Sequence, residues 1–164
     1  AYKGSILEFY KDTMVTPDGK VTYWDHIEHK GAAAVVPVLD DGRIVLVRQY
    51  RNSPDEETLE IPAGGLEADE PTELAAIREL EEETGYDAKT WKSLGYINTT
   101  PGICDEKLYL YYAKDLTYNK PHPDEGEILQ LFEYTKEEVF AMIKNGEIND
   151  SKTLCALLRA YKID

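Results

Sequence analysis

Basic residues are scarce relative to acidic ones in this chain. Lys and Arg together number 18 against 32 Asp and Glu, which gives a formal net charge of −14 at pH 7. Nucleic acids and anionic membrane surfaces are themselves negatively charged, so neither is an expected partner of an acidic protein. A phosphate-containing ligand stays compatible with this charge where metal ions and a few arginines screen the site.

Cysteines and long apolar segments are also few. The two cysteines, Cys104 and Cys155, lack the spacing of metal ligands, and two isolated thiols indicate a reducing compartment. No stretch is long and apolar enough to cross a membrane, and the first residues lack the apolar core of a signal peptide. We therefore expect a cytoplasmic protein whose 164 residues fold as one domain.

Hydrophobic patterning predicts strands interleaved with helices, and hence a mixed α/β (α+β) sandwich. The run at 31–39 is apolar throughout, which is typical of a strand buried on both faces, and the turn after it indicates a hairpin with a strand at 44–49. Further strands are expected within 5–28, around a turn at 17–20, and at 58–61, 91–98, 107–114 and 128–134. Helices are expected at 71–83, at 135–144, where Thr135 and Glu138 resemble a capping box, and from 150 or 151 to about 162.

The stretch from Gly64 to Gly85 is rich in glutamate. Glu79, Glu82 and Glu83 are three or four positions apart, so they share one face of a helix. Like charges at this spacing repel one another, and a hard divalent cation with carboxylate ligands would compensate them. The alternative interpretation is an acidic helix face that is simply solvated.

The same stretch resembles the Nudix box, G-x5-E-x7-R-E-U-x-E-E-x-G-U, in which U is a bulky apolar residue. The matching positions are Gly64, Glu70, Arg78, Glu79, Leu80, Glu82, Glu83 and Gly85, and Tyr86 stands at the last U, where an aliphatic residue is commoner. The resemblance implies the Nudix fold, a mixed β-sheet sandwiched between helices, over residues 31–164. Residues 1–30 would then form an N-terminal antiparallel β extension.

The resemblance also implies a Mg²⁺ site, with Mn²⁺ as a substitute. Glu79 and Glu83 would ligate the metal directly, and Glu82 would ligate or support it. The backbone carbonyl of Ala63 matches a further ligand of the family. Arg78 would orient the glutamates from within the site, so that Arg78 and Glu82 are also candidate catalytic residues.

Three features outside the box resemble the ADP-ribose pyrophosphatase branch of the family. They are the E-x-P-A-G run that leads into the box, the Q-Y-R run that ends at Arg51, and Pro101-Gly102, about fifteen residues past the box, where Thr100 replaces the usual serine. By resemblance, Arg51 would grip the phosphates of the substrate through the fork of its guanidinium. For Pro101 and Gly102, an ordinary turn is the alternative.

The general base of this branch is a glutamate on a mobile loop after the box. The D-E-x-E run at 124–127 resembles that loop, with Glu125 preferred and Glu127 second. A base on a loop can move in when substrate closes the site. A polar turn without a catalytic role is the alternative.

Adenine recognition calls for an aromatic surface. Trp24 aligns with a position where relatives place a stacking tryptophan, and Phe9 is a second candidate, while plain packing on a half-exposed strand is the alternative for Trp24. The branch exchanges its N-terminal strands across a homodimer. The resemblance therefore implies a homodimer in which the aromatic residues of one subunit complete the site of the other.

These residues and the resemblance together predict Mg²⁺-dependent hydrolysis of ADP-ribose, or a related ADP-sugar, to AMP and ribose 5-phosphate. One alternative is the same chemistry on another nucleotide sugar, such as ADP-glucose or GDP-mannose. Another is a non-catalytic domain that senses ADP-ribose or has only a structural role. The complete set of glutamates in the box disfavours both non-catalytic alternatives.

Overall fold

The computed structural model describes residues 2–3, 7–122 and 129–161, and these residues form three β-sheets and three α-helices. The first sheet has the order β1 (Tyr2–Lys3), β2 (Glu8–Val15) and β3 (Val21–Glu28). The second has the order β10 (Gln130–Tyr134), β5 (Ile44–Arg51) and β6 (Glu56–Glu60). The third has the order β7 (Ala63–Gly65), β4 (Ala32–Pro37), β9 (Lys107–Tyr118) and β8 (Tyr86–Asn98).

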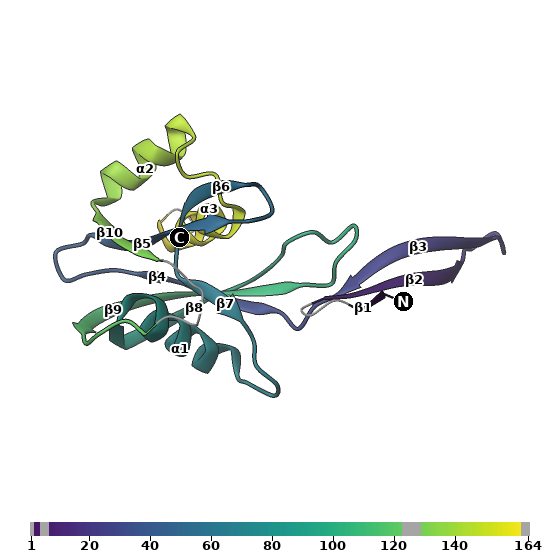
Figure 1. Ribbon diagram of the computed structural model, residues 1–164, viewed down its shortest axis with the longest axis horizontal. Helices are drawn as coiled ribbons and strands as arrows, with labels where there is room; N and C mark the ends of the chain where they lie inside the picture. The colour runs from purple at the N-terminus through teal and green to yellow at the C-terminus, as the bar shows by residue number, and fades with distance from the viewer. Residues whose placement is uncertain (1, 4–6, 123–128, 162–164) are drawn as a thin grey trace.

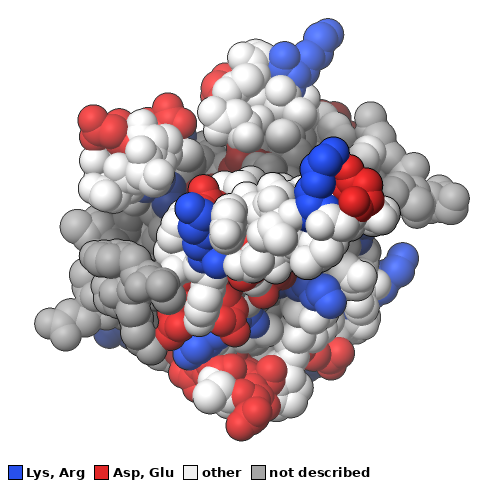
Figure 2. Space-filling model, turned by 90° about the vertical axis from the view of Figure 1, so that its right-hand side faces the viewer, with Lys and Arg blue, Asp and Glu red and all other residues white. Residues whose placement is uncertain are grey.

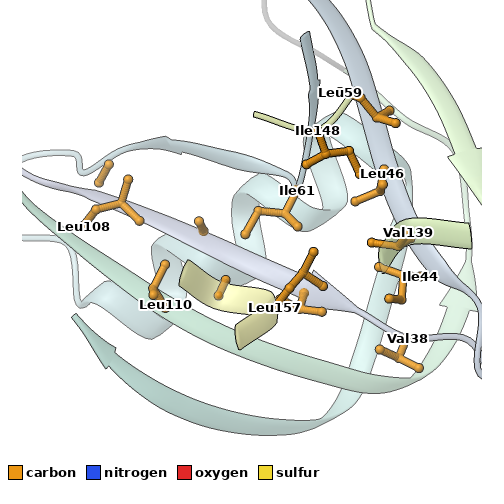
Figure 3. Close-up of a cluster of buried hydrophobic side chains, with 14 residues drawn as sticks. Val38, Ile44, Leu46, Leu59, Ile61, Leu108, Leu110, Val139, Ile148 and Leu157 are labelled. Atoms are coloured by element: carbon orange, nitrogen blue, oxygen red, sulfur yellow. The ribbon is translucent and has the colours of Figure 1, made fainter. Parts of the chain in front are cut away.

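The core is built around β4, whose residues are all buried. Ala34 and Val36 face one core cluster, which includes Leu157 of α3 (Ser151–Tyr161), and Figure 3 shows this cluster. Ala33 and Val35 belong to a second cluster on the other face of the strand, together with residues of α1 (Thr72–Thr84). Helices α1 and α3 therefore cover opposite faces of the third sheet (Figure 1). The predicted strand buried on both faces is confirmed.

The three helices begin and end where local sequence signals allow it. Helix α1 follows Pro71 and ends at Gly85, which adopts a left-handed conformation with φ of 71°. Helix α2 (Lys136–Asn145) begins with the predicted capping box, in which Thr135 and Glu138 bond reciprocally. Asp150 caps α3 by accepting a hydrogen bond of 2.9 Å from the backbone N–H of Thr153.

The hairpin of β2 and β3 extends away from the rest of the molecule (Figure 1). Its two strands pair in antiparallel register from Glu8–Glu28 to Val15–Val21, around the predicted turn at 17–20. Seen from the hairpin end, Lys and Arg side chains lie interspersed with Asp and Glu and form no continuous basic face (Figure 2). Whether this hairpin joins two subunits stays a prediction.

The predicted hairpin between 31–39 and 44–49 is wrong. Strand β4 pairs with β7 on one edge and, in parallel, with β9 on the other, whereas β5 belongs to another sheet. Among the described residues, strand pairing between the two segments is limited to the isolated bridge of Val38 and Ile44. Both edges of β4 are occupied by strands that are distant in the sequence, and local turn signals do not report such pairing.

Several element bounds also differ from the predictions. Strands β8 and β9 are longer than predicted because they pair with each other along almost their whole length. Strand β6 begins at Glu56, two residues before the predicted strand at 58–61, and 63–65 form the further strand β7. No helix of the described chain is long and apolar enough to cross a membrane.

Candidate active site

Arg78 is the centre of the acidic cluster on α1. Its Nε and Nη2 donate to the two carboxylate oxygens of Glu70, both at 3.0 Å. Its Nη1 donates to Glu79 at 2.6 Å and to Glu82 at 2.9 Å. The hydrogen bonds to Glu70 are the largest cause of a raised pKa of Arg78, so its charge is permanent. This guanidinium supplies part of the compensating charge that the crowded glutamates require.

The helix carboxylates face the backbone of β7. The Glu79 side chain lies so close to Gly64 that a Cβ added there would be 2.1 Å from the Glu79 Oε1 atom. Glu83 is 3 % exposed and accepts a hydrogen bond of 3.1 Å from the backbone N–H of Ala63. Glycine at position 64 thus allows the helix and the strand to approach closely enough to bring these groups together.

The oxygen donors at this junction suit a hard divalent cation. Magnesium and calcium prefer carboxylate and carbonyl oxygens, and Glu79, Glu82 and Glu83 provide carboxylates on one helix. Within the described ranges, no three His, Cys, Asp or Glu side chains converge in the arrangement of a metal site. Arg78 binds oxygens of two of these glutamates instead. An ion and Arg78 would therefore share the carboxylates of Glu79 and Glu82.

A second charged cluster joins β5, β6 and α3. The Nε and Nη2 atoms of Arg51 donate to the two oxygens of the Glu60 carboxylate, at 2.9 Å and 2.5 Å. Thr58 donates to the same carboxylate, and the Lys152 ammonium is bonded to it as well. Burial by itself would raise the pKa of Glu60, but the hydrogen bond from Arg51 and the charge of Lys152 outweigh burial and lower it to about 2.

Arg51 and Lys152 of this second cluster line a cavity of about 310 Å³, together with the backbone of β7 that contacts Glu79 and Glu83. Arg51 and the backbone of Gly64 line it from different sheets. The remaining lining residues are His29, Ala32, Ala63, Gly65, Glu106, Leu108 and Lys152. Sequence reasoning identified Arg51 and Ala63 here but missed Lys152, His29 and Glu106, which carry no motif that separates them from ordinary polar residues.

A second cavity, of about 280 Å³, lies between the hairpin and the loop at 100–105. Trp24, Pro101 and Gly102 all line it, so the structure brings together three candidates that were predicted separately. The backbone N–H of Ile27 donates to the carbonyl of Ile103 at 2.7 Å, and this hydrogen bond fixes the loop to β3. Trp24 is 61 % exposed, which leaves its ring accessible for stacking.

The structure separates Phe9 from Trp24. Phe9 pairs with Ile27, whereas Trp24 pairs with Asp12. Cross-strand partners share a face and neighbouring residues alternate, so Phe9 and Trp24 point to opposite faces of the hairpin. Within one copy of the chain the two rings therefore do not face the same base, and both stay candidates for adenine recognition.

The predicted general bases, Glu125 and Glu127, lie outside the described residues. Their roles stay predictions that the structure does not address. The backbone N–H of His122, at the end of the described segment, donates to the carbonyl of Glu82 at 3.0 Å. The chain that leads toward 123–128 therefore passes the C-terminal end of α1.

Comparison with known proteins gives consistent matches. The family model described as NUDIX domain matches residues 28–157. The chain is 36 % identical over 158 residues to a protein of Bacillus subtilis (strain 168) named ADP-ribose pyrophosphatase. The aligned region covers 95 % of this chain and 85 % of the relative. It is 38 % identical to a Bacillus methanolicus protein named methanol dehydrogenase activator, with the same two coverages.

The fold also matches solved structures. A crystal structure titled ADP compounds hydrolase aligns with a TM-score of 0.86 over 98 % of this chain and 87 % of that chain. Its sequence identity to this chain is 21 %, so the likeness speaks for the fold alone. The mixed α/β architecture predicted from the sequence is confirmed.

Proposed function

The chain belongs to the NUDIX domain family, and on that premise we propose that it hydrolyses the diphosphate bond of ADP-ribose or a related nucleoside diphosphate sugar. Relatives that this chain matches over most of their length carry the name ADP-ribose pyrophosphatase. The observation that carries the proposal is a single cavity lined by Arg51 and by Ala63 and Gly64, which contact the glutamates of α1. Such a cavity offers a phosphate-binding cation next to oxygen donors for a metal.

On ADP-ribose the reaction consumes one water and gives AMP and ribose 5-phosphate. The water oxygen forms a bond to one phosphorus while the bridging P–O bond breaks, and the bridging oxygen leaves with the electron pair on the other phosphate. Nudix hydrolases generally need a divalent metal. We propose Mg²⁺, with Mn²⁺ as a substitute.

Glu79, Glu83 and the carbonyl of Ala63 would hold the metal, and Glu82 would ligate or support it. When bound, a divalent ion polarises phosphoryl oxygens and makes a water molecule easier to deprotonate. Arg78 would orient these glutamates, because its guanidinium donates hydrogen bonds to Glu79 and Glu82. It therefore keeps both carboxylates near their working positions.

Arg51 would bind the diphosphate, because it lines the cavity and carries a permanent charge, with a pKa that the hydrogen bond to Glu60 raises further. The base that takes the water proton would be Glu125, or else Glu127. The described chain reaches the C-terminal end of α1 at His122, shortly before these two residues in the sequence. A loop position lets the base approach after substrate has bound.

The second cavity would bind the adenine, with Trp24 stacking on the ring beside Pro101 and Gly102. Phe9 faces the other side of the hairpin and would serve the site of a second copy of the chain. A homodimer built through the N-terminal extension, residues 1–30, would satisfy both placements. Light scattering on purified protein would test this state.

The first experiment measures AMP release from ADP-ribose by the wild-type protein, with Mg²⁺ and with EDTA. Metal-dependent release of AMP is the expected result, and parallel assays with ADP-glucose and GDP-mannose identify the preferred sugar. No hydrolysis of any of these substrates, with calorimetric binding of ADP-ribose intact, would instead support the sensing domain.

Glu83→Gln tests the metal assignment in the same assay. The substitution removes the charge of a carboxylate that is 3 % exposed while keeping its shape, so most activity should be lost although the protein stays folded. Circular dichroism checks the fold. Turnover equal to the wild type in this variant would refute the role of Glu83.

A further inference from the structure

Lys152 is a buried cation in the first turn of α3, far from the box in the sequence. It is 9 % exposed, an unusual environment for a lysine. Its ammonium is bonded to the Glu60 carboxylate and lies 3.1 Å from the Oδ2 atom of Asp150. Next to it, the fully buried Thr153 accepts a hydrogen bond of 3.0 Å from the backbone N–H of Ile61. The start of α3 is therefore fixed against the end of β6.

Glu60 orients Arg51 but also opposes its charge. The carboxylate occupies the Nε–Nη2 edge of the guanidinium, so a phosphate would be met by the remaining Nη1 edge. An arginine paired one-to-one with a carboxylate forms a unit that is neutral overall. Such a unit attracts an anionic diphosphate less strongly than a free guanidinium does.

Lys152 supplies the second positive charge on the same carboxylate. Its other anionic neighbour, Asp150, also accepts hydrogen bonds from the backbone N–H and the hydroxyl of Thr153, at 2.9 Å and 2.6 Å. Part of the Asp150 charge is thus met by the N-terminus of α3, where the helix dipole favours an anion. Lys152 therefore offsets part of the negative charge that Glu60 places beside Arg51, on which Glu83 and Asp150 also act.

Both cations also face the same space. Arg51 and Lys152 line the cavity of about 310 Å³ that contains the backbone of Gly64. Arg51 has 40 % of its side chain exposed, whereas Lys152 has 11 %, so Arg51 is the residue placed to touch a ligand. Lys152 contacts Glu60, and it can therefore influence Arg51 through that carboxylate.

We propose that Lys152 is a positioning residue for substrate binding, which holds Glu60 so that Arg51 stays both oriented and positively charged toward the diphosphate of a nucleoside diphosphate sugar. This inference rests on the proposed function. It assigns a role in ground-state binding, so it predicts a change in KM and in affinity, with a much smaller change in kcat.

The test compares Lys152→Met, which keeps the length of the side chain without its charge, with Lys152→Arg, which keeps the charge. Lys144→Met is the matched control, because Lys144 lies exposed on α2 and does not line the cavity. KM and kcat are measured on ADP-ribose with Mg²⁺. Calorimetric titration with ADP-ribose in EDTA gives affinity without turnover, and thermal unfolding gives the stability of each variant.

We expect Lys152→Met to raise KM and weaken binding by about tenfold, with kcat within about threefold of wild type. Lys152→Arg should recover most of the affinity, and Lys144→Met should match the wild type. If Lys152→Met does not fold, Lys152→Gln, which keeps a hydrogen-bond donor without the charge, is measured in its place with the same expectation.

Unchanged KM and affinity in the uncharged variant would overturn the inference, as would a loss confined to kcat or to the unfolding temperature. If the uncharged variant shows unchanged KM and affinity, its normal turnover of ADP-ribose would leave the proposed function intact. A wild-type protein that neither cleaves nor binds ADP-ribose would overturn the proposed function, and the role of Lys152 with it.

Discussion

Glu60→Gln should destabilise the protein strongly, and more so at neutral than at acidic pH. Glu60 is 2 % exposed and binds two cations, Arg51 and Lys152. Its pKa is about 2 in the folded protein against a usual value of 4.5. Because the folded protein favours the ionised form, the carboxylate contributes stability above the unfolded pKa, and this contribution disappears as pH falls through the folded pKa.

The magnitude follows from the size of the pKa shift. A fall from 4.5 to about 2 corresponds to about 3 kcal/mol of unfolding free energy at pH 7. Removal of one partner from a buried ion pair costs roughly 3–5 kcal/mol in other proteins, which agrees with this value. At pH 3 the same linkage leaves a contribution of only about 1.4 kcal/mol. The melting temperature at pH 7 should fall by roughly 6–12 °C for a chain of this size.

Urea unfolding followed by circular dichroism measures the effect, with wild type and variant compared at pH 7, 5, 4 and 3. The difference between the two proteins isolates Glu60 from the many other carboxylates that titrate in this range. Asp18→Asn is the control, because Asp18 pairs with Lys20 on the exposed hairpin turn and its loss should leave the midpoint unchanged. A Glu60→Gln difference that is small at pH 7, or that does not shrink toward pH 3, would refute the reasoning.

Two further substitutions test other parts of the structure. Gly64→Ala would place a methyl group 2.1 Å from the Glu79 carboxylate, so the carboxylate must move and turnover of ADP-ribose should fall well below that of wild type, while the unfolding midpoint changes little. Thr135→Ala removes the capping box of α2 and should cost about 1 kcal/mol in urea unfolding without changing KM. Retained turnover in the first variant, or an unchanged midpoint in the second, would contradict these expectations.

Local sequence signals were sufficient for the parts of the fold that depend on neighbouring residues. The helix with the glutamates, the capping box at Thr135 and the turn before β3 were all predicted correctly, since each depends on residues within a few positions of one another. The fully apolar run of β4 correctly indicated burial on both faces. Its sheet partners were not predictable in this way, because β9 lies more than 70 residues further along the chain.

The same distinction holds for the site. The box and the Q-Y-R run identified residues that the structure places around one cavity, but Lys152 reaches Glu60 across 92 positions of sequence. A lysine in the first turn of a helix has no local feature that predicts burial. Nor did the sequence indicate that Phe9 and Trp24 face opposite ways, because this follows from the register of the two strands.

Under the proposed function, the two cavities would separate the handling of the diphosphate from recognition of the rest of the substrate. The first is lined by Arg51, Gly64 and Lys152, which belong to two sheets and a helix joined by buried contacts. The second is lined by Trp24 and Pro101, on an exposed hairpin and a loop, and the two cavities share no lining residue. Substitutions in the second cavity can therefore change which base or sugar is accepted while the groups that act on the diphosphate stay in place. In such a molecule, substrate preference should respond to changes in the hairpin and the loop, and the hydrolytic step to changes around α1, β6 and the start of α3.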